Sequence, residues 1–288
     1  MAVGVKKLFG TDGIRGVANQ WPLTPDFVVR LGQAIGQIIV HESDKPAVVI
    51  GRDTRLSGQM LEDALAAGLM SQGVDTLHLG VITTPGIAYL TRRLQARVGI
   101  VISASHNPYQ DNGIKLFGPD GFKIPDEMEA EIERLAQTGS GRENAIAHSS
   151  LGRRWDGSDY RGDYLDYLAG TVAGTTPLRG MRVILECANG ATSELAPALF
   201  QKLGAEVIAL NHRPDGLNIN QSYEYIEPHS LRQAVLREGA DLGAAFDGDG
   251  DRVILVDEEG GFVDGDFVKA ILARQMKAHG QLRHNTVV

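Results

Sequence analysis

Short, strongly apolar runs alternate with amphipathic helical patterns along this chain, first between residues 28 and 137 and again between residues 160 and 279. Residues 46–50 and 98–102 are two such runs, and each is typical of a strand buried on both faces. Strands that alternate with helices fold into α/β layers. At 288 residues and 43% hydrophobic content, the chain is long enough for two cores of this kind.

The pattern predicts the domain organisation. A stretch rich in glycine, serine and charge, residues 138–157, is predicted to be a linker. We therefore expect one α/β domain over residues 1–150 and a second over residues 151–257. The last residues, Thr286 to Val288, resemble the beginning of a buried strand, so residues 258–288 are expected to be the start of a truncated third domain.

Charge and cysteine content exclude several classes of function. The net charge of −8 argues against a nucleic acid or an anionic membrane as partner and favours a small metabolite. Cys187 is the single cysteine and cannot form an internal disulfide. Residues 1–7 contain no apolar signal region, and no long apolar span follows, so the expected location is the cytoplasm.

A serine and a histidine follow one of the predicted strands, in residues 102–108 (ISASHNP). Because Asn107 precedes a proline, the strand cannot continue, and Ser105 and His106 are expected on the loop at its end. A serine hydroxyl is a weak nucleophile that needs a base, a metal or an electrophilic donor such as a phosphoryl group. From this segment alone, an ordinary turn is an equally good interpretation. The G-x-S-x-G motif of serine hydrolases is absent around Ser105.

Three carboxylates, Asp247, Asp249 and Asp251, alternate with other residues between two predicted strands. Two carboxylates about 4 Å apart repel by roughly 4 kcal/mol at an effective dielectric constant of about 20, so a converging trio favours a bound cation. Oxygen ligands favour Mg²⁺, while a solvated acidic turn is the simpler alternative. An EF-hand is disfavoured because Arg252 stands where that loop needs glycine. A phosphatase that forms an aspartyl phosphate remains a rival, but it leaves Ser105 unexplained.

Cationic residues lie near these motifs. Glycines flank Arg15 and would allow close approach of an anion. Lys115 would return to Ser105 if residues 113–117 form the adjacent strand. Arg52 and Arg55 follow a predicted strand, where phosphate binding and ordinary surface charge are equally good interpretations.

Residues 9–16, 51–58, 102–115 and 247–252 together resemble the α-D-phosphohexomutase family, in the same order and at compatible spacings. This resemblance implies two complete α/β domains with mixed sheets sandwiched by helices, followed by the start of a third. It also implies three groups of site residues. The catalytic group is Ser105, His106, Lys115 and Arg15. The group that binds the substrate and its phosphate is Thr11, Arg52, Asn107 and Arg252. The metal group is Ser105, Asp247, Asp249 and Asp251.

Within the family, FGTDGIRG at residues 9–16 and ISASHNP at residues 102–108 resemble the phosphoglucosamine mutase branch. In place of ISASHNP, the phosphomannomutase/phosphoglucomutase branch usually has TASHNP or a near variant. Residues 187–191 and 216–220 also fit the former branch. Both branches share the same catalytic residues, so the second remains an alternative, as does a non-catalytic binding fragment.

The resemblance implies a phosphoryl relay through Ser105. The phosphorylated serine would give its group to glucosamine 6-phosphate, and glucosamine 1,6-bisphosphate would return the other phosphate and leave glucosamine 1-phosphate. One Mg²⁺ per chain is the implied metal, with His106 or Lys115 as general acid and base. The implied partners are a sugar phosphate and a second copy in a homodimer, without nucleic acid or membrane, in the cytoplasmic synthesis of cell-envelope amino sugars.

Two departures from the family pattern affect these expectations. Residues 221–228 differ from the glycine-rich loop that is common there. The sugar-recognition motif G-E-x-S-G-H of the third domain and the phosphate-binding loop of the fourth are absent from the sequence. Remote binding positions the reacting end of a substrate, so these 288 residues are expected to show little or no mutase turnover alone.

Overall fold

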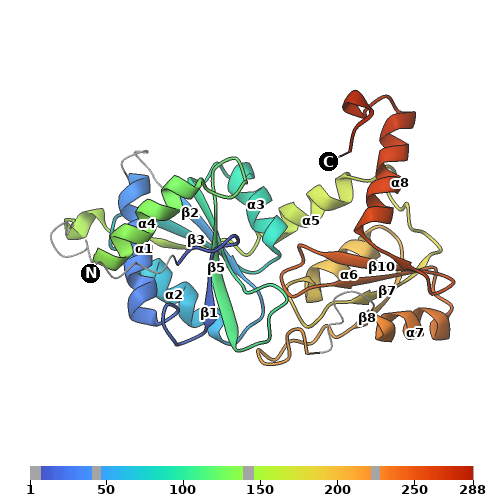
Figure 1. Cartoon of the computed structure of the whole chain (residues 1–288), viewed down its shortest axis with the longest axis horizontal. Helices are drawn as coiled ribbons and strands as arrows, with labels where there is room; N and C mark the ends of the chain where they lie inside the picture. Colours follow the sequence, from blue (N-terminus) through green and yellow to red (C-terminus); the bar gives the residue numbers. More distant parts are fainter. Residues whose placement is uncertain (1–7, 41–46, 139–145, 222–227, 288) are drawn as a thin grey trace, which may run out of the picture.

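The computed structural model describes residues 8–40, 47–138, 146–221 and 228–287. Two lobes, each built on one β-sheet with helices on both faces, lie side by side along the long axis of the molecule (Figure 1). The family-type fold predicted from the sequence, with mixed sheets between helices, is confirmed. The differing loop at 222–227 and the linker segment 139–145 lie outside the described residues.

The first sheet has six strands in the order β1-β5-β4-β2-β3-β6. Strands β2, β3, β4 and β6 run parallel, whereas β5 is antiparallel to both β4 and β1. The strands are β1 (Ile14–Val17), β2 (Ala47–Arg52), β3 (Asp75–Val81), β4 (Val98–Ile102), β5 (Asp111–Phe117) and β6 (Arg154–Asp156).

The apolar runs of this sheet are continuous because the strands are buried on both faces. In β2, Val48 and Ile50 pack into one core, and Val49 between them packs into the other. The first core is closed by α1 (Pro25–Val40), α2 (Ser57–Met70) and α4 (Asp126–Thr138). The second is closed by α3 (Thr84–Arg93) and α5 (Tyr160–Gly170). This alternation is the usual period of two residues in a strand.

The second sheet has five strands in the order β11-β10-β9-β7-β8. Its central strands β7 and β9 are parallel, and β10 returns antiparallel to β9. The strands are β7 (Arg182–Glu186), β8 (Glu206–Leu210), β9 (Leu242–Phe246), β10 (Val253–Asp257) and β11 (Phe262–Val263). Helix α6 (Thr192–Lys202) covers one face and α7 (His229–Glu238) the other.

The structure corrects the expected division of the chain at two places. Strand β6 lies inside the stretch predicted to be a linker, and it pairs with β3, so the first sheet extends past the predicted boundary at residue 150. Strand β11 pairs with β10, so the second sheet extends past the boundary expected at residue 257. Both strands are very short, with three and two residues, and too short to produce a recognisable apolar period.

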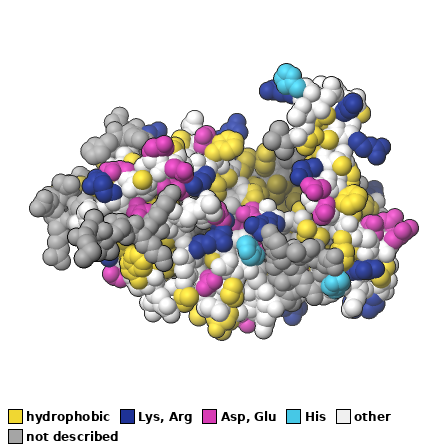
Figure 2. Space-filling view, in the orientation of Figure 1, with side chains coloured by type: hydrophobic (Ala, Val, Ile, Leu, Met, Phe, Trp, Pro, Cys, Tyr) yellow, Lys and Arg dark blue, Asp and Glu magenta, His cyan; other side chains and the backbone are white. Residues whose placement is uncertain are grey.

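Helix α8 (Gly265–Ala278) stands away from the second sheet, and a single 3-10 turn (Arg283–Asn285) follows it (Figure 1). Its apolar side chains Phe267, Ile271, Leu272 and Met276 are exposed. Figure 2 shows hydrophobic side chains gathered in the recess beside this helix. Among the helices of the described residues, none combines the length and the apolar character needed to cross a membrane.

The loops at the carboxyl ends of the two sheets face each other. The Thr54 hydroxyl, just after β2, donates to the carbonyl of Asn189, just after β7, over 2.5 Å. The backbone N–H of Leu56 donates to the carbonyl of Gly216 over 2.9 Å. In α/β proteins this edge is where ligands bind, so the fold places two such edges around one space.

We expect Tyr164→Ala to weaken the packing of α5 on the first sheet. Tyr164 of α5 is only 5% exposed, and it packs in one core with side chains of β2, β4 and α3. Truncation of a buried aromatic ring costs about 3 kcal/mol of the free energy of unfolding. Urea unfolding measures this loss. The control is Tyr160→Ala on the same helix, where the ring is 36% exposed and the expected loss is under about 1 kcal/mol. Equal losses would contradict this role of α5.

Candidate phosphoryl-transfer site

The loop after β4 carries Ser105, as the sequence predicts. Strand β4 ends at Ile102, and Ser105 has a positive φ of 52°, which is uncommon for a residue other than glycine. Its backbone N–H donates to the Ser103 hydroxyl over 2.9 Å. Strand β5 then returns beside β4 and places Lys115 opposite Val101. The adjacent strand that would bring Lys115 back toward Ser105 is thus confirmed.

The Ser105 hydroxyl points at the acidic loop of the other lobe. Its Oγ donates a hydrogen bond of 2.7 Å to Oδ2 of Asp247, the first residue after β9. On its other side, Oγ lies 3.4 Å from Nδ1 of His106. Ser105 is 1% exposed, so its hydroxyl is held between these two groups and is not that of an ordinary surface turn.

Asp247, Asp249 and Asp251 converge as expected, with one carboxylate oxygen of each within 4.8 Å of the others. Burial and the neighbouring Asp249 and Asp251 carboxylates raise the pKa of Asp247 to about 7. Burial and the Asp249 charge also raise the pKa of Asp251. Repulsion between buried carboxylates is therefore present, as the spacing in the sequence predicts.

This cluster fits a hard divalent cation. All the ligand atoms are oxygens, the donor set that Mg²⁺ prefers. In addition, Oδ1 of Asp249 is buried and has no hydrogen-bond partner among the residues that the structure describes. A buried acceptor without a donor is costly, and a metal ion would satisfy it.

Lys115 balances part of the negative charge. Its Nζ lies 3.0 Å from Oδ2 of Asp249, 3.0 Å from Oδ2 of Asp12 and 3.7 Å from Oδ2 of Asp251. Burial opposes the charged form of Lys115, but Asp249 and Asp12 outweigh it and raise its pKa. Burial acts to raise the pKa of Asp249, but the charge of Lys115 acts in the opposite direction. As a result, the pKa of Asp249 is lowered. Lys115 is therefore a fixed positive charge.

A cleft of about 390 Å³ opens beside this cluster. Its lining includes Thr11, Asp12, Arg15, His106 and Arg252, so the loop before β1 and the ends of β4 and β9 all contribute. Figure 2 shows basic, acidic and histidine side chains side by side in the middle of this face, where the lobes meet. Burial and the positive charges of Arg252 and Arg15 lower the pKa of His106, which favours its neutral form.

Comparison with known proteins matches both lobes to one family. The model for phosphoglucomutase/phosphomannomutase α/β/α domain I matches residues 6–143, and the model for domain II matches residues 162–261. The chain belongs to this family, the phosphohexomutases. Its two α/β lobes correspond to the family's first two domains.

Curated relatives named phosphoglucosamine mutase match almost the whole chain. The protein from Desulforamulus reducens is 49% identical over 282 residues, which are 98% of this chain and 63% of the relative. The protein from Bacillus cereus is 51% identical, with 98% and 62% covered. The protein from Bdellovibrio bacteriovorus is 51% identical, with 98% and 63% covered. The chain thus spans less than two thirds of these relatives.

Solved structures show the same fold. A phosphoglucomutase/phosphomannomutase family protein from Burkholderia thailandensis superposes with a TM-score of 0.81 at 27% identity, over 95% of this chain and 59% of that one. A putative phosphomannomutase from Thermus thermophilus superposes with a TM-score of 0.80 at 27% identity, over 94% and 62%.

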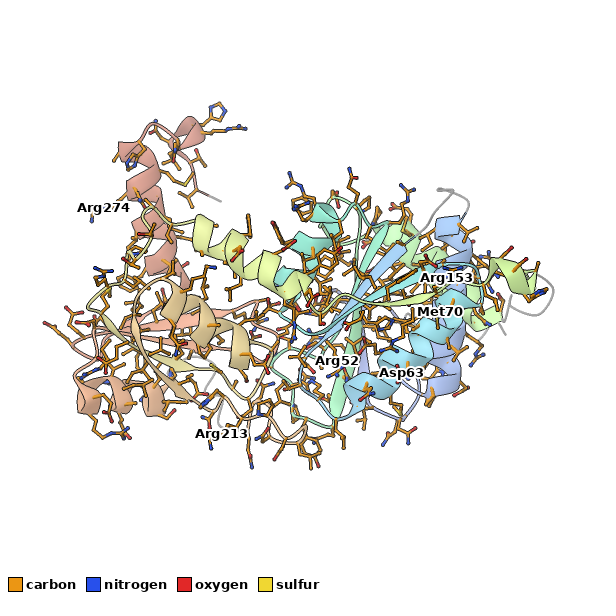
Figure 3. All side chains as sticks on the ribbon, turned by 180° about the vertical axis from the view of Figure 1, so that it is seen from behind. Arg52, Asp63, Met70, Arg153, Arg213 and Arg274 are labelled. Atoms are coloured by element: carbon orange, nitrogen blue, oxygen red, sulfur yellow. The ribbon has the colours of Figure 1, made fainter. Side chains whose placement is uncertain are left out.

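The side chains of two residues expected to bind the substrate in this phosphohexomutase site make other contacts. Arg52 does not reach the cleft, because its Nε is bound to Oε2 of the buried Glu62 at 2.9 Å, in a separate pocket that also contains His78. Figure 3 labels Arg52 beside the helices of the first lobe. The side chain of Asn107 donates to Oδ2 of Asp111 over 2.8 Å and so braces its own loop. Arg52, expected in the group that binds the substrate and its phosphate, thus lies outside the cleft in this arrangement.

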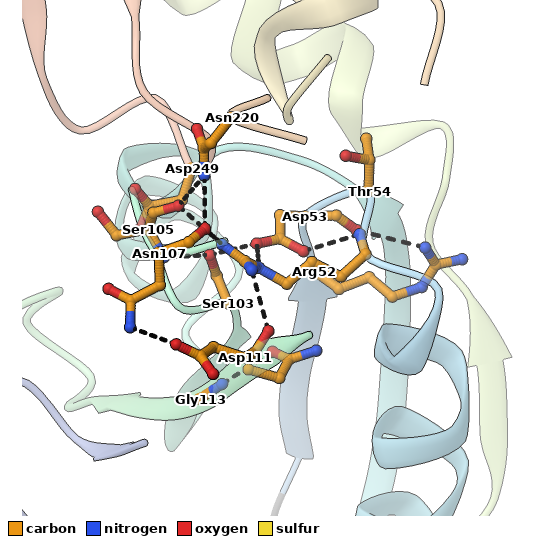
Figure 4. A network of polar contacts seen from close by, with 12 residues as sticks. Arg52, Asp53, Thr54, Ser103, Ser105, Asn107, Asp111, Gly113, Asn220 and Asp249 are labelled. Carbon is orange, nitrogen blue, oxygen red and sulfur yellow. Dashed lines mark hydrogen bonds and ion pairs between the residues drawn. The ribbon is translucent and has the colours of Figure 1, made fainter. Parts of the chain in front are cut away.

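Three further residues shape the site, and sequence reasoning singled out only Arg55 among them, with its role left open. The Thr84 hydroxyl donates to Oδ2 of Asp249 over 2.7 Å. Arg55, for which surface charge was an equally good interpretation, is fully buried beneath the Ser105 loop. Asn220 reaches the same loop from the second lobe (Figure 4). The Asp-x-Arg sequence after β2 was a signal for Arg55. Asn220 ends the segment 216–220 that fits the family resemblance, but nothing in that segment indicates which loop it contacts.

We expect divalent cations to bind this cluster more weakly as pH falls. A cation competes with the proton that Asp247 retains up to a pH of about 7. The affinity for the cation should level off above that pH and fall by up to about tenfold per pH unit below it. Binding should also release a proton from Asp247. Calorimetry with Mg²⁺ and Mn²⁺ at several pH values, in buffers of different ionisation enthalpy, measures both effects.

Two variants make this measurement specific. Asp247→Asn should remove most of the binding together with its pH dependence. The control Asp266→Asn, on the exposed first turn of α8, should leave both unchanged. Affinity that stays constant through this pH range, or binding without proton release, would contradict the assignment.

Proposed function

We propose that this chain carries the phosphoryl-transfer centre of a phosphoglucosamine mutase, which interconverts glucosamine 6-phosphate and glucosamine 1-phosphate. One observation carries the proposal: the Ser105 hydroxyl is hydrogen-bonded to Asp247 within a three-aspartate cluster, beside a cleft lined by Arg15 and Arg252. The relatives named phosphoglucosamine mutase, at about 50% identity, support this substrate over other sugar phosphates. A homodimer in the cytoplasm is part of the same proposal.

Ser105 is the phosphoryl carrier in this mechanism. A phosphoserine brings close to two negative charges at neutral pH into a site that already holds three carboxylates. Asp247, Asp249 and Asp251 would hold Mg²⁺, which when bound supplies positive charge to the phosphoryl group during transfer. Thr84 fixes one of these carboxylates from the first lobe, so the ligand set is aimed at Ser105 before any substrate arrives.

The cationic side chains have separate tasks. Lys115 remains protonated between Asp12 and Asp249 and provides a fixed charge next to Ser105. His106, with Nδ1 at 3.4 Å from Oγ, is placed to accept the proton of the attacking hydroxyl and to return it in the next step. Arg15 and Arg252 both line the cleft and would bind the phosphate of the sugar.

The reaction transfers one phosphoryl group in each direction. Phosphoserine 105 gives its phosphoryl group to the O1 hydroxyl of glucosamine 6-phosphate, which yields glucosamine 1,6-bisphosphate and a free serine. After the sugar turns over in the cleft, the Ser105 hydroxyl attacks the phosphate at position 6. Glucosamine 1-phosphate leaves, and the phosphoserine is regenerated.

Incubation with glucosamine 1,6-bisphosphate and Mg²⁺ should place a single phosphate on Ser105. Intact mass and phosphopeptide mapping measure this product without requiring full turnover. Ser105→Ala should abolish it, whereas Ser158→Ala, a serine in the separate pocket with Arg52, should not. Phosphate on Asp247 would instead assign the protein to the aspartyl-phosphate class, and no phosphate on any residue would overturn the proposal.

A second candidate is a phosphomannomutase or phosphoglucomutase, because solved structures of the same fold carry those names. Initial rates of Ser105 phosphorylation by the 1,6-bisphosphates of glucosamine, glucose and mannose separate the candidates. We expect glucosamine 1,6-bisphosphate to be the fastest donor. A faster mannose or glucose donor would favour the second candidate, and equal rates would mean that this chain does not distinguish the sugars.

A further inference from the structure

Two backbone carbonyls of the Ser105 loop are each held twice, once from each lobe. Nη2 of Arg55, in the first lobe, donates to the carbonyls of Ser105 and Asn107, both over 2.9 Å. Nδ2 of Asn220, in the second lobe, donates to the same two carbonyls over 2.8 and 3.0 Å. Figure 4 shows Asn220 reaching the loop of Ser105 and Asn107.

Arg55 is a permanent part of the first lobe. Its Nε donates to Oδ2 of Asp53 over 2.8 Å, and its Nη1 donates to the carbonyls of Asp111, over 2.9 Å, and Pro108. The Ser103 hydroxyl donates to the same Asp53 carboxylate. These buried contacts bind the loop from below whether or not the second lobe is docked.

Asn220 provides the matching contact from above. It lies between β8 and α7, and its own N–H donates to the carbonyl of Ala188 over 2.9 Å, which fixes it to the second lobe. The packing around its amide is close, because a Cβ at Gly248 would lie 2.6 Å from the Ser105 carbonyl oxygen and 2.8 Å from Nδ2 of Asn220. Facing two carbonyl oxygens, the amide must present its NH₂ group.

We propose that Asn220 is a positioning residue that makes the reactivity of Ser105 depend on docking of the second lobe, an inference that rests on the proposed function. The left-handed backbone of Ser105, with φ of 52°, is held at its carbonyl by Asn220, while its hydroxyl is held by Asp247. Both contacts come from the second lobe. Loss of the amide lets the backbone of Ser105 relax and turns Oγ away from the carboxylates.

Asn220 acts through Ser105 and not on the substrate. Asn220 is not among the described residues that line the cleft. Both hydrogen bonds that its side-chain amide donates go to main-chain carbonyl oxygens. Its removal should therefore change how fast bound bisphosphate reacts, and leave unchanged the bisphosphate concentration that gives half of the maximal rate.

Two substitutions test this role in the full chain. Asn220 has a positive φ of 58°, so Asn220→Gly deletes the amide without backbone strain. Asn220→Asp keeps the size but replaces the NH₂ group with an oxygen that faces two carbonyls. We expect the maximal rate of Ser105 phosphorylation by glucosamine 1,6-bisphosphate and Mg²⁺ to fall about tenfold or more for the glycine variant and further for the aspartate variant. The control Asn19→Gly, with φ of 61° in the first lobe, should keep the wild-type rate.

Hydrogen exchange separates this inference from the proposed function. In Asn220→Gly, amides of residues 103–112 should exchange faster, while amides of β2 stay unchanged. The wild-type protein could take up no phosphate while residues 103–112 still exchange faster in Asn220→Gly. In that case the proposed function fails, but the inference that Asn220 holds the Ser105 loop stands. A wild-type rate in Asn220→Gly, or exchange that rises equally in β2, would overturn the inference.

Discussion

The rest of the site depends on one electrostatic constraint, the burial of Asp247 and Asp249 beside Asp251 in the second lobe. Buried carboxylates this close together cannot all stay ionised without positive charge nearby. The positive charge comes mainly from the other lobe, through Lys115 at 3.0 Å from Asp249. The constraint therefore links local chemistry to the arrangement of the lobes, because Lys115 of the first lobe pairs with Asp249 of the second. Within the second lobe itself, Arg252 lies 3.8 Å from Asp251.

Much of the fold could be predicted from the sequence, because long strands buried on both faces leave a clear apolar signature. Val98 to Ile102 is an example, and the serine loop and the acidic loop lie at strand ends as predicted. Strands β6 and β11 escaped prediction because they are too short to show the alternation of apolar and polar residues that is typical of a strand. Each forms by pairing with a longer neighbour, β3 for β6 and β10 for β11.

Individual site residues were harder to predict, and the two arginines after β2 show why. Arg52 and Arg55 lie three positions apart in one polar segment, but Arg52 pairs with Glu62 while Arg55 turns inward under the Ser105 loop. Strand β2 ends at Arg52, so the alternation of a strand does not assign the direction of Arg55. Asn220 is further from prediction, since its partners are main-chain oxygens 113 and 115 residues away.

Separation of the lobes would remove polar partners on both sides, although Lys115 would keep Asp12 of its own lobe. Lys115 would lose Asp249, Thr84 would lose its carboxylate acceptor, and the carbonyls of the Ser105 loop would keep only Arg55. Removing one partner from a buried ion pair in the docked protein costs about 3–5 kcal/mol, so each of these groups depends on its partner in the other lobe. The groups that hold Ser105 in its reactive geometry are thus among those that hold the two lobes together, and an aligned nucleophile requires docked lobes.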